Sequence, residues 1–298
     1  MFKFLTATIA LLSICVYKTE AQLKTIPQIE KATHDQFSNA VTEFREFLKI
    51  PNDGNYPEQI QANVEWVTDA FEKRGFKTQL LESPGAPHVY AQKQFVKNGK
   101  TVLFYLQIDG QPVDTSAWDQ DSPFKATLKE EQNGKWQAID WKKFDENFNP
   151  DWRIYARSAS DSKGPAMCFL TALSILEKNK VKPNFNIKVI MDFQEELSSP
   201  QLARMVQKNK DLLQSDMVLI MDGTRHVSNL PTLCFGARGI ATATIKIYGP
   251  RNALHSGQYG NYAPNPVFNM SKLLSGLKDD NGRVTLPGFY DGINLSDE

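Results

Sequence analysis

Three apolar runs of this chain end in acidic or amide side chains, and this pattern restricts the possible folds more than any other feature. The runs cover residues 101–106, 187–193 and 217–221, and the polar groups after them are Gln107-Ile108-Asp109, Glu195-Glu196 and Met221-Asp222-Gly223. Apolar runs that alternate with helical stretches predict βαβ units and a mostly parallel sheet. Ligands of such a sheet bind where its strands end, so these polar side chains are candidates for one site.

Other segments of the chain also have regular patterns. Residues 59–74 carry apolar side chains at helical spacing and end at Gly75, which predicts a helix. We expect strands over residues 76–81 and 88–95, and further helices over residues 164–179 and 200–206. The predicted fold class is therefore α/β.

The charge balance narrows the class of partner. The chain has 298 residues, with 34 Lys plus Arg, 34 Asp plus Glu and a formal net charge of zero. A chain without a basic excess lacks the electrostatic footprint of a protein that binds nucleic acid or an anionic membrane. The hydrophobic content of 41% is enough for a sizeable core. We therefore expect small molecules or peptides as partners and no nucleic acid.

The first 21 residues have the pattern of a secretory signal peptide. A short basic start, Met1-Phe2-Lys3, precedes an apolar stretch over residues 4–16 and a small-residue cleavage site before Gln22. The stretch is shorter than the roughly 20 residues that a membrane-spanning helix needs, although an uncleaved anchor is an alternative. Lipidation at Cys15 is a second alternative, which the large Ile14 before it disfavours. We expect a secreted or periplasmic protein.

The pattern of the chain changes near Gly236. Residues 240–248 alternate strictly between two faces, which predicts a half-buried strand of a different sheet. We therefore expect an α/β domain over residues 22–235 and part of an α+β domain over residues 236–298. Nothing in the sequence indicates an internal repeat.

Aromatic and sulfur-containing residues lead to two predictions about packing. Residues 111–150 are polar, but this stretch and its end carry Trp118, Trp136, Trp141 and Trp152. We expect a loop-rich cover over the sheet edge or part of a cleft wall; the favoured alternative is aromatic packing under a long loop. Cys168 and Cys234 lie in apolar surroundings and are expected to be buried, and a disulfide between them is an open alternative.

The acidic groups along the chain indicate a bound cation. Asp161, Glu196 and Asp222 lie on successive elements, and carboxylates gathered at one edge would repel one another without a positive partner. Oxygen ligands hold divalent ions, and a pair of such ions acidifies a water molecule and polarises a carbonyl. Glu195, beside a ligand, could then accept the proton of that water and pass it to a leaving nitrogen.

Two histidines are weaker candidates for the site. His255 precedes the turn-like pair Ser256-Gly257, and His226 follows Asp222 by four residues. Taken alone, each residue fits a surface or core histidine better than a functional one.

Together these segments resemble the M20 metallopeptidase family, which includes carnosinase-like dipeptidases, acetylornithine deacetylase and succinyl-diaminopimelate desuccinylase. The resemblance covers about residues 30–298 and rests on five motifs in order, Gln107-Ile108-Asp109, Ser160-Asp161-Ser162-Lys163-Gly164, Glu195-Glu196, Met221-Asp222-Gly223 and Leu254-His255-Ser256-Gly257. It implies a zinc-peptidase-like α/β catalytic domain with an inserted α+β lid that serves for dimerisation. A homodimer through the lid is the implied assembly.

The resemblance also implies two divalent metal ions, with zinc expected from the family. Asp161 would bridge them, with Glu196 completing one site and Asp222 the other. Gln107 departs from the family pattern His-x-Asp, because glutamine offers a neutral carbonyl oxygen where the pattern places an imidazole. Such an oxygen suits Mg or Mn better than Zn. This site is therefore expected to be weak, to take another ion such as Mn, Co or Mg, or to be empty.

The remaining motif residues receive catalytic and substrate-binding roles from the resemblance. Asp109 would orient the ligand of the first motif, and Glu195 would be the general base. His255, which is reached across a dimer interface in many members, would hold the substrate or its tetrahedral intermediate, with Arg251 as a further candidate for binding the substrate.

These roles lead to one expected function and one alternative. We expect a metal-dependent hydrolase that cleaves dipeptides or N-acyl amino acids. The alternative is a non-catalytic binding protein that has lost hydrolysis together with the histidine replaced by Gln107. The sequence also stops at Glu298, inside the implied lid and before the segment that supplies the last histidine ligand in the family. We therefore expect a fragment of a longer protein.

Overall fold

The computed structural model describes residues 23, 25–146, 149–222, 228, 230, 232–236 and 239–293. The chain divides into two compact units, Met1–Pro231 (unit 1) and Thr232–Glu298 (unit 2). The predicted signal peptide, residues 1–21, lies outside the described residues. In the described part of the chain, no helix is both long enough and apolar enough to cross a membrane.

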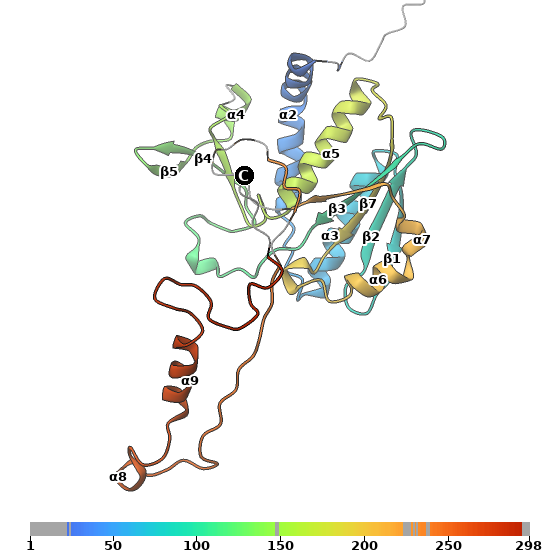
Figure 1. Cartoon of the computed structure of the whole chain (residues 1–298). Helices are drawn as coiled ribbons and strands as arrows, with labels where there is room; N and C mark the ends of the chain where they lie inside the picture. Colours follow the sequence, from blue (N-terminus) through green and yellow to red (C-terminus); the bar gives the residue numbers. More distant parts are fainter. Residues whose placement is uncertain are drawn as a thin grey trace, which may run out of the picture. The chain divides into compact units, whose positions relative to one another are not determined.

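Unit 1 is built on a five-stranded sheet with the order β1-β2-β7-β3-β8 (Figure 1). Its strands are β1 (Lys77–Leu81), β2 (His88–Lys93), β3 (Thr101–Gln107), β7 (Asn186–Asp192) and β8 (Met217–Met221). β7, β3 and β8 run parallel, whereas β1 and β2 extend the sheet in antiparallel pairing beyond β7. The predicted α/β class is confirmed, and the parallel part of the sheet contains all three apolar runs.

Helices cover both faces of the central strands β2, β7 and β3, which explains why these strands are apolar, whereas the edge strand β8 is largely exposed. The covering helices are α2 (Ile26–Leu48), α3 (Pro57–Glu72), α5 (Lys163–Lys178), α6 (Leu202–Lys208) and α7 (Lys210–Leu213). α3 and α5 pack on one face, with α2 against α5, and α6 and α7 pack on the other (Figure 1). Adjacent residues of β7 point to opposite faces of the sheet. Val189 packs in the hydrophobic core shared with α3 and α5, which we call the main cluster, and Ile190 packs in the core shared with α6 and α7.

The helix α2 was not identified from the sequence, although it contributes to the core. Its residues Val41, Phe47 and Leu48 are buried. The ring of Phe47 stacks on Trp66 of α3, with 3.7 Å between the ring centroids. α2 therefore joins the main cluster through aromatic packing.

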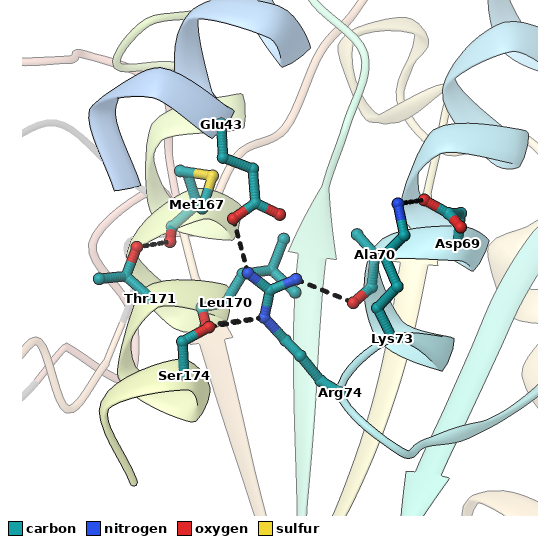
Figure 2. Close-up of polar contacts among 9 residues, drawn as sticks. All are labelled: Glu43, Asp69, Ala70, Lys73, Arg74, Met167, Leu170, Thr171 and Ser174. Atoms are coloured by element: carbon teal, nitrogen blue, oxygen red, sulfur yellow. Dashed lines mark hydrogen bonds and ion pairs between the residues drawn. The ribbon is translucent and has the colours of Figure 1, made fainter. Parts of the chain in front are cut away.

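A buried arginine joins three helices on this side of the sheet. Arg74, just after α3, donates from Nη2 to Glu43 of α2 at 2.7 Å and from Nη1 to the Ala70 carbonyl at 2.9 Å (Figure 2). Its Nε donates to the Leu170 carbonyl and the Ser174 hydroxyl of α5 at 3.1 and 3.0 Å. These contacts satisfy the donors of a side chain that would be costly to bury unpaired.

The polar stretch over residues 111–150 is more regular than predicted. It forms most of a three-stranded antiparallel sheet in the order β5-β4-β6, made of β4 (Thr127–Gln132), β5 (Lys135–Ala138) and β6 (Arg153–Tyr155). Asn133 and Gly134, both with positive φ, join β4 to β5, and this pair is a hairpin signal that the sequence already contained. The expected aromatic packing is present, because Trp141 and Trp152 pack with Leu128, Phe144 and Val41 beside α4 (Lys142–Glu146).

The strand predicted over residues 240–248 is absent from unit 2, so this prediction was wrong. These residues are in no strand, and Ile240 is 91% exposed. A strand requires a hydrogen-bonded neighbour, and the described residues of unit 2 contain the short helices α8 (Ser256–Tyr259) and α9 (Pro266–Ser275) with one isolated bridge, Lys278 to Val284. The alternating pattern therefore has no partner strand in this part of the chain.

The prediction for the two cysteines was also wrong. Cys168 and Cys234 are both exposed. Cys168 lies on α5, and its apolar neighbours Met167 and Phe169 are buried while Cys168 itself points outward. One residue of a helix differs from the next by about 100° in direction, so apolar neighbours in sequence do not imply burial.

Candidate active site

The carboxyl ends of three parallel strands meet at one edge of the sheet in unit 1. Gln107, the last residue of β3, pairs in register with Asp192, the last residue of β7. On its other side β3 pairs with β8, where Leu106 lies opposite Met221. The acidic residues that follow these strands therefore begin from neighbouring positions. This is the edge at which open α/β sheets bind ligands.

A buried carboxylate fixes the turn that carries Glu195 and Glu196. We call residues 193–199 the base turn; it contains the short helix η2 (Glu195–Leu197). Asp109 is 3% exposed and accepts the backbone N–H groups of Glu195 and Glu196, each at 3.1 Å. Burial raises the pKa of Asp109 to about 7, while these two hydrogen bonds act against the rise. Asp109 thus orients the candidate base through its backbone.

Glu195 lies among other carboxylates. Burial raises its pKa first, and the charges of Asp222, Glu196 and Asp161 raise it further. The three predicted acidic ligands therefore act on the same side chain. A hollow of about 640 Å³ is lined by Glu195, Asp222 and Gln107 among others. Like charges at this density favour a bound cation.

Glu196 has a partner that was not identified from the sequence. Nε2 of Gln111 donates to Oε2 of Glu196 at 2.6 Å. Gln111 lies two residues after Asp109, so the first motif contacts the third through both residues. A polar residue so close to a candidate motif was the available signal.

Donors, in contrast, fix the segment that carries Asp161. We call residues 158–164 the Asp161 loop. Ser162 donates its hydroxyl to Oε1 of Gln107 at 2.6 Å. Lys163 is 1% exposed, and its Nζ donates to the carbonyls of Phe47 and Ile50 at 2.9 and 2.6 Å. Asp161 itself is exposed.

Lys163 is a structural residue of this site rather than a surface charge. It lies in the second motif, yet its role was not apparent from the sequence, because the carbonyls that it binds lie at the end of α2, 113 and 116 residues earlier. Burial holds the pKa of Lys163 well below its usual range. The amine therefore serves as a hydrogen-bond donor to the last turn of α2.

Close backbone approach beneath the base turn requires a glycine. A Cβ placed on Gly54 would lie 2.8 Å from the Phe193 carbonyl oxygen and 3.3 Å from Oδ2 of Asp109. Nε2 of Gln194 also donates to the Gly54 carbonyl at 3.0 Å. The base turn is thus packed directly on residue 54.

The residues at this edge fit a divalent metal by their chemistry. Asp161, Glu196 and Asp222 supply oxygen donors, and their combined charge already acts on Glu195. Among the described residues, no group of three or more His, Cys, Asp or Glu side chains is arranged to hold a metal. Oε1 of Gln107 accepts the Ser162 hydroxyl, which leaves one lone pair of that oxygen. His226 lies outside the described residues.

The predicted substrate-binding residues His255 and Arg251 belong to unit 2. Both line one hollow of about 770 Å³ in that unit. Nδ1 of His255 accepts the backbone N–H of Gly257 at 3.1 Å, at the start of α8.

Two protein-family models match the chain. Peptidase family M20/M25/M40 matches residues 103–252, about half of the chain, and the peptidase dimerisation domain matches residues 235–295. The first match includes the base turn and the Asp161 loop, and the whole of the second lies in unit 2.

Two of the curated proteins that this chain resembles are dipeptidases. The Beta-Ala-His dipeptidase of Homo sapiens is 29% identical over 195 residues, covering 65% of this chain and 34% of that protein. The cysteinylglycine-S-conjugate dipeptidase of Corynebacterium striatum is 26% identical over 251 residues, covering 83% of this chain and 50% of that protein. This chain thus spans about a third to a half of the length of these relatives.

Solved structures share the fold. The M20 family metallo-carboxypeptidase Sso-CP2 from Sulfolobus solfataricus is 30% identical, with a TM-score of 0.66, covering 87% of this chain and 54% of that chain. Human carnosine dipeptidase 1 has the same fold, with a TM-score of 0.60 at 22% identity, covering 90% of this chain and 56% of that chain. Together with the family match over half of its length, these likenesses show that the chain belongs to peptidase family M20/M25/M40.

Proposed function

We propose that this protein is a metal-dependent hydrolase of dipeptides or N-acyl amino acids, with Glu195 as the general base. The proposal rests mainly on the hydrogen bonds that the carboxylate of Asp109 accepts from the backbone N–H groups of Glu195 and Glu196. Through these bonds, a buried carboxylate holds a candidate base next to a candidate metal ligand. Such an arrangement suits a site in which proton transfer and metal binding occur at adjacent residues, because both side chains must be positioned.

Gln107, Asp161, Glu196 and Asp222 would hold the metal. Two divalent ions bound there would polarise the scissile carbonyl and acidify the attacking water. Zinc is the ion expected from the family, and the neutral oxygen of Gln107 makes Mn, Co or Mg candidates as well. Gln111 would keep one oxygen of Glu196 turned toward the first motif, because its Nε2 donates to that carboxylate.

Glu195 would move the proton during hydrolysis. Its carboxylate accepts a proton from the attacking water and then donates it to the leaving nitrogen. Burial and the neighbouring carboxylates raise the pKa of Glu195, which makes it a better proton acceptor than an exposed glutamate. His255 and Arg251 of unit 2 would bind the substrate carboxylate or stabilise the tetrahedral intermediate.

A non-catalytic binding protein is the second candidate, and one contact favours it. Oε1 of Gln107 already accepts the Ser162 hydroxyl at 2.6 Å, so the replaced ligand is engaged within the protein. A site with a weakened metal ligand could still bind a peptide without cleaving it. The presence of Glu195 with all three acidic ligands favours hydrolysis over this alternative.

We further propose that unit 2 forms a homodimer contact. The match to the peptidase dimerisation domain supports this proposal, as does the apolar surface of α9, where Val267 and Phe268 are 68% and 75% exposed. Sedimentation velocity of the wild type and of Phe268→Glu tests it. A dimer that dissociates in the variant is expected, and a wild-type monomer at micromolar concentration would contradict it.

Export is a separate proposal that rests on residues 1–21. Expression in a secreting host, followed by N-terminal sequencing, should give a mature chain that begins at Gln22. A product that keeps Met1 and remains in the cell would contradict export.

Metal content and peptidase activity test the main proposal. The purified protein is analysed by plasma mass spectrometry beside an Asp161→Ala variant, and both are assayed against dipeptides and N-acyl amino acids. We expect bound Zn, Mn or Co in the wild type, little in the variant, and hydrolysis only by the wild type. A protein that takes up none of these ions would contradict the hydrolase and favour the binding protein.

A further inference from the structure

A buried polar cluster lies directly behind the base turn. It is formed by Asp192 at the end of β7, Tyr105 on β3, Ser199 at the end of the base turn and His88 on β2. Asp192 is 2% exposed and His88 is 3% exposed. The motifs described above include none of the four residues. A buried carboxylate is costly unless hydrogen bonds compensate it, so its partners show what its burial achieves.

The partners of Asp192 lie at both ends of the base turn. Oδ1 accepts the backbone N–H of Gln194 at 2.9 Å, and Oδ2 accepts the hydroxyl of Ser199 at 2.7 Å. Oδ2 also accepts the hydroxyl of Tyr105 at 3.0 Å, which ties the carboxylate to the neighbouring strand. One side chain therefore closes the turn from its first residues to its last.

His88 does not neutralise this carboxylate by a short hydrogen bond. Its Nε2 lies 3.7 Å from Oδ1 of Asp192, and neither ring nitrogen has a hydrogen-bond partner among the described residues. Burial lowers the pKa of His88, and the charge of Asp192 opposes that effect. The hydrogen bonds from the base turn and Tyr105 are therefore the main compensation for Asp192.

We infer that Asp192, with Tyr105 and Ser199, is a positioning group that holds the base turn in the conformation that presents Glu195 and Glu196. This inference rests on the proposed function in naming Glu195 as the base. Asp109 fixes the backbone of residues 195 and 196, and Asp192 fixes residues 194 and 199 on either side of them. Two buried carboxylates thus hold consecutive parts of one short turn.

The test removes the hydroxyls and keeps the carboxylate. The double variant Tyr105→Phe/Ser199→Ala takes away both donors to Oδ2. Its matched control is Tyr90→Phe, because Tyr90 is buried on the same face of the sheet and donates to Gln92 at 3.1 Å, away from the base turn. Asp192→Ala and Asp192→Asn complete the set, since asparagine can still accept the N–H of Gln194.

Two readouts separate positioning from a general loss of stability. The first is hydrogen–deuterium exchange of the peptide that contains residues 193–199, compared with the peptide that contains α3. The second is kcat against KM for a cleaved peptide. We expect faster exchange in the base turn alone and a kcat lowered about tenfold to a hundredfold with KM nearly unchanged, since a small displacement of a base has effects of this size. Asp192→Asn should recover part of the kcat that Asp192→Ala loses.

The outcomes are distinguishable from those of the proposed function. A wild type that cleaves no peptide would overturn the proposed function, while the exchange result would still decide whether Asp192 holds the turn. Unchanged exchange over residues 193–199 in the double variant would overturn the inference, as would faster exchange with an unchanged kcat. An equal fall in kcat for Tyr90→Phe would assign the effect to packing and would also overturn it. If Asp192→Ala does not fold, the double variant and its control still give the answer.

Discussion

The two segments that carry the carboxylates of the site are held in opposite ways. The base turn is fixed mainly by acceptors, because Asp109 and Asp192 receive its N–H groups and the Ser199 hydroxyl, although Gln111 donates to the side chain of Glu196. The Asp161 loop is fixed by donors, because the hydroxyl of Ser162 and the amine of Lys163 bind oxygen atoms of the surrounding structure.

This difference links the ordering of each segment to the negative charge around Glu195. Asp192, which holds both ends of the base turn, also raises the pKa of Glu195 through its negative charge, so ordering the turn increases the need for a cation. In the Asp161 loop, the amine satisfies carbonyl oxygens at the end of a core helix, and Asp161 remains exposed. Changes in the base turn should therefore affect chemistry first, and changes in the Asp161 loop should affect stability first.

The largest effect is expected for Glu195→Gln in the base turn. Glutamine keeps the shape of the side chain but cannot accept a proton, so kcat should fall about a thousandfold. The free energy of unfolding should stay within about 1 kcal/mol of the wild type, because the substitution removes a like charge near Asp222 and Glu196. Steady-state kinetics and urea unfolding check the two expectations. A kcat within tenfold of the wild type would exclude Glu195 as the base.

The next largest effect is expected for Lys163→Met in the Asp161 loop. Methionine keeps most of the volume but leaves the buried carbonyls of Phe47 and Ile50 without this donor. An unsatisfied buried group costs about 1–3 kcal/mol, so the free energy of unfolding should fall by about 2–4 kcal/mol. Urea unfolding measures this change.

A matched control for this substitution is Lys188→Met. Nζ of Lys188 also donates to two carbonyls, those of Leu212 and Gln214 at 2.6 and 2.7 Å, but the residue is only half-buried. Water can replace the lost donor there, so the loss should stay below about 1 kcal/mol. Equal losses in the two variants would contradict the structural role of Lys163.

Most elements of unit 1 could be predicted from the sequence, because their signals are local. Apolar runs and helical spacing identified β3, β7, β8, α3 and α5 to within a few residues. The acidic residues after the strands could be placed at one sheet edge for the same reason. The strand over residues 240–248 was predicted wrongly, because alternation describes two faces but not whether a neighbouring strand exists.

The contacts that organise the site could not be predicted in this way. Tyr105 and Asp192 are 87 residues apart, and Lys163 and Phe47 are 116 apart. Such pairs become visible only when the strand order and the helix packing are known. Lys163 is also an unusual case, since lysine is among the residues least often buried. The assignment of ligands and base to particular motif residues came from the family resemblance and stays a prediction.

A smaller effect is expected where the base turn packs on Gly54. In Gly54→Ala, the new methyl group would lie 2.8 Å from the Phe193 carbonyl oxygen, so the turn must shift. We expect a loss of about 1–2 kcal/mol in the free energy of unfolding. A fall in kcat of about tenfold should accompany it, because the turn carries the base.

A second glycine separates the two effects of this substitution. Gly134→Ala strains a hairpin turn at φ +76°, where an added Cβ meets nothing within 4 Å. It should cost about 1 kcal/mol without changing kcat. If both variants lowered kcat equally, the close approach at Gly54 would not explain the loss.

The smallest effect is expected where the two segments meet, at Gln107. Gln107→His places an imidazole at the end of β3, and zinc prefers this ligand to a neutral carbonyl oxygen. Zinc affinity should rise about tenfold, which corresponds to about 1.4 kcal/mol. The variant also loses the hydrogen bond that Ser162 donates to Oε1, which should lower the free energy of unfolding of the metal-free protein by about 1 kcal/mol.

Zinc competition with a chelating dye measures the affinity, and Gln107→Leu, which cannot bind a metal, is the control. Equal affinities in the wild type and both variants would mean that Gln107 holds the Asp161 loop through Ser162 and takes no part in metal binding. Gln107 would then act only as a hydrogen-bond acceptor that holds the protein together, as Asp109 and Asp192 do. The metal would be bound by Asp161, Glu196 and Asp222 alone.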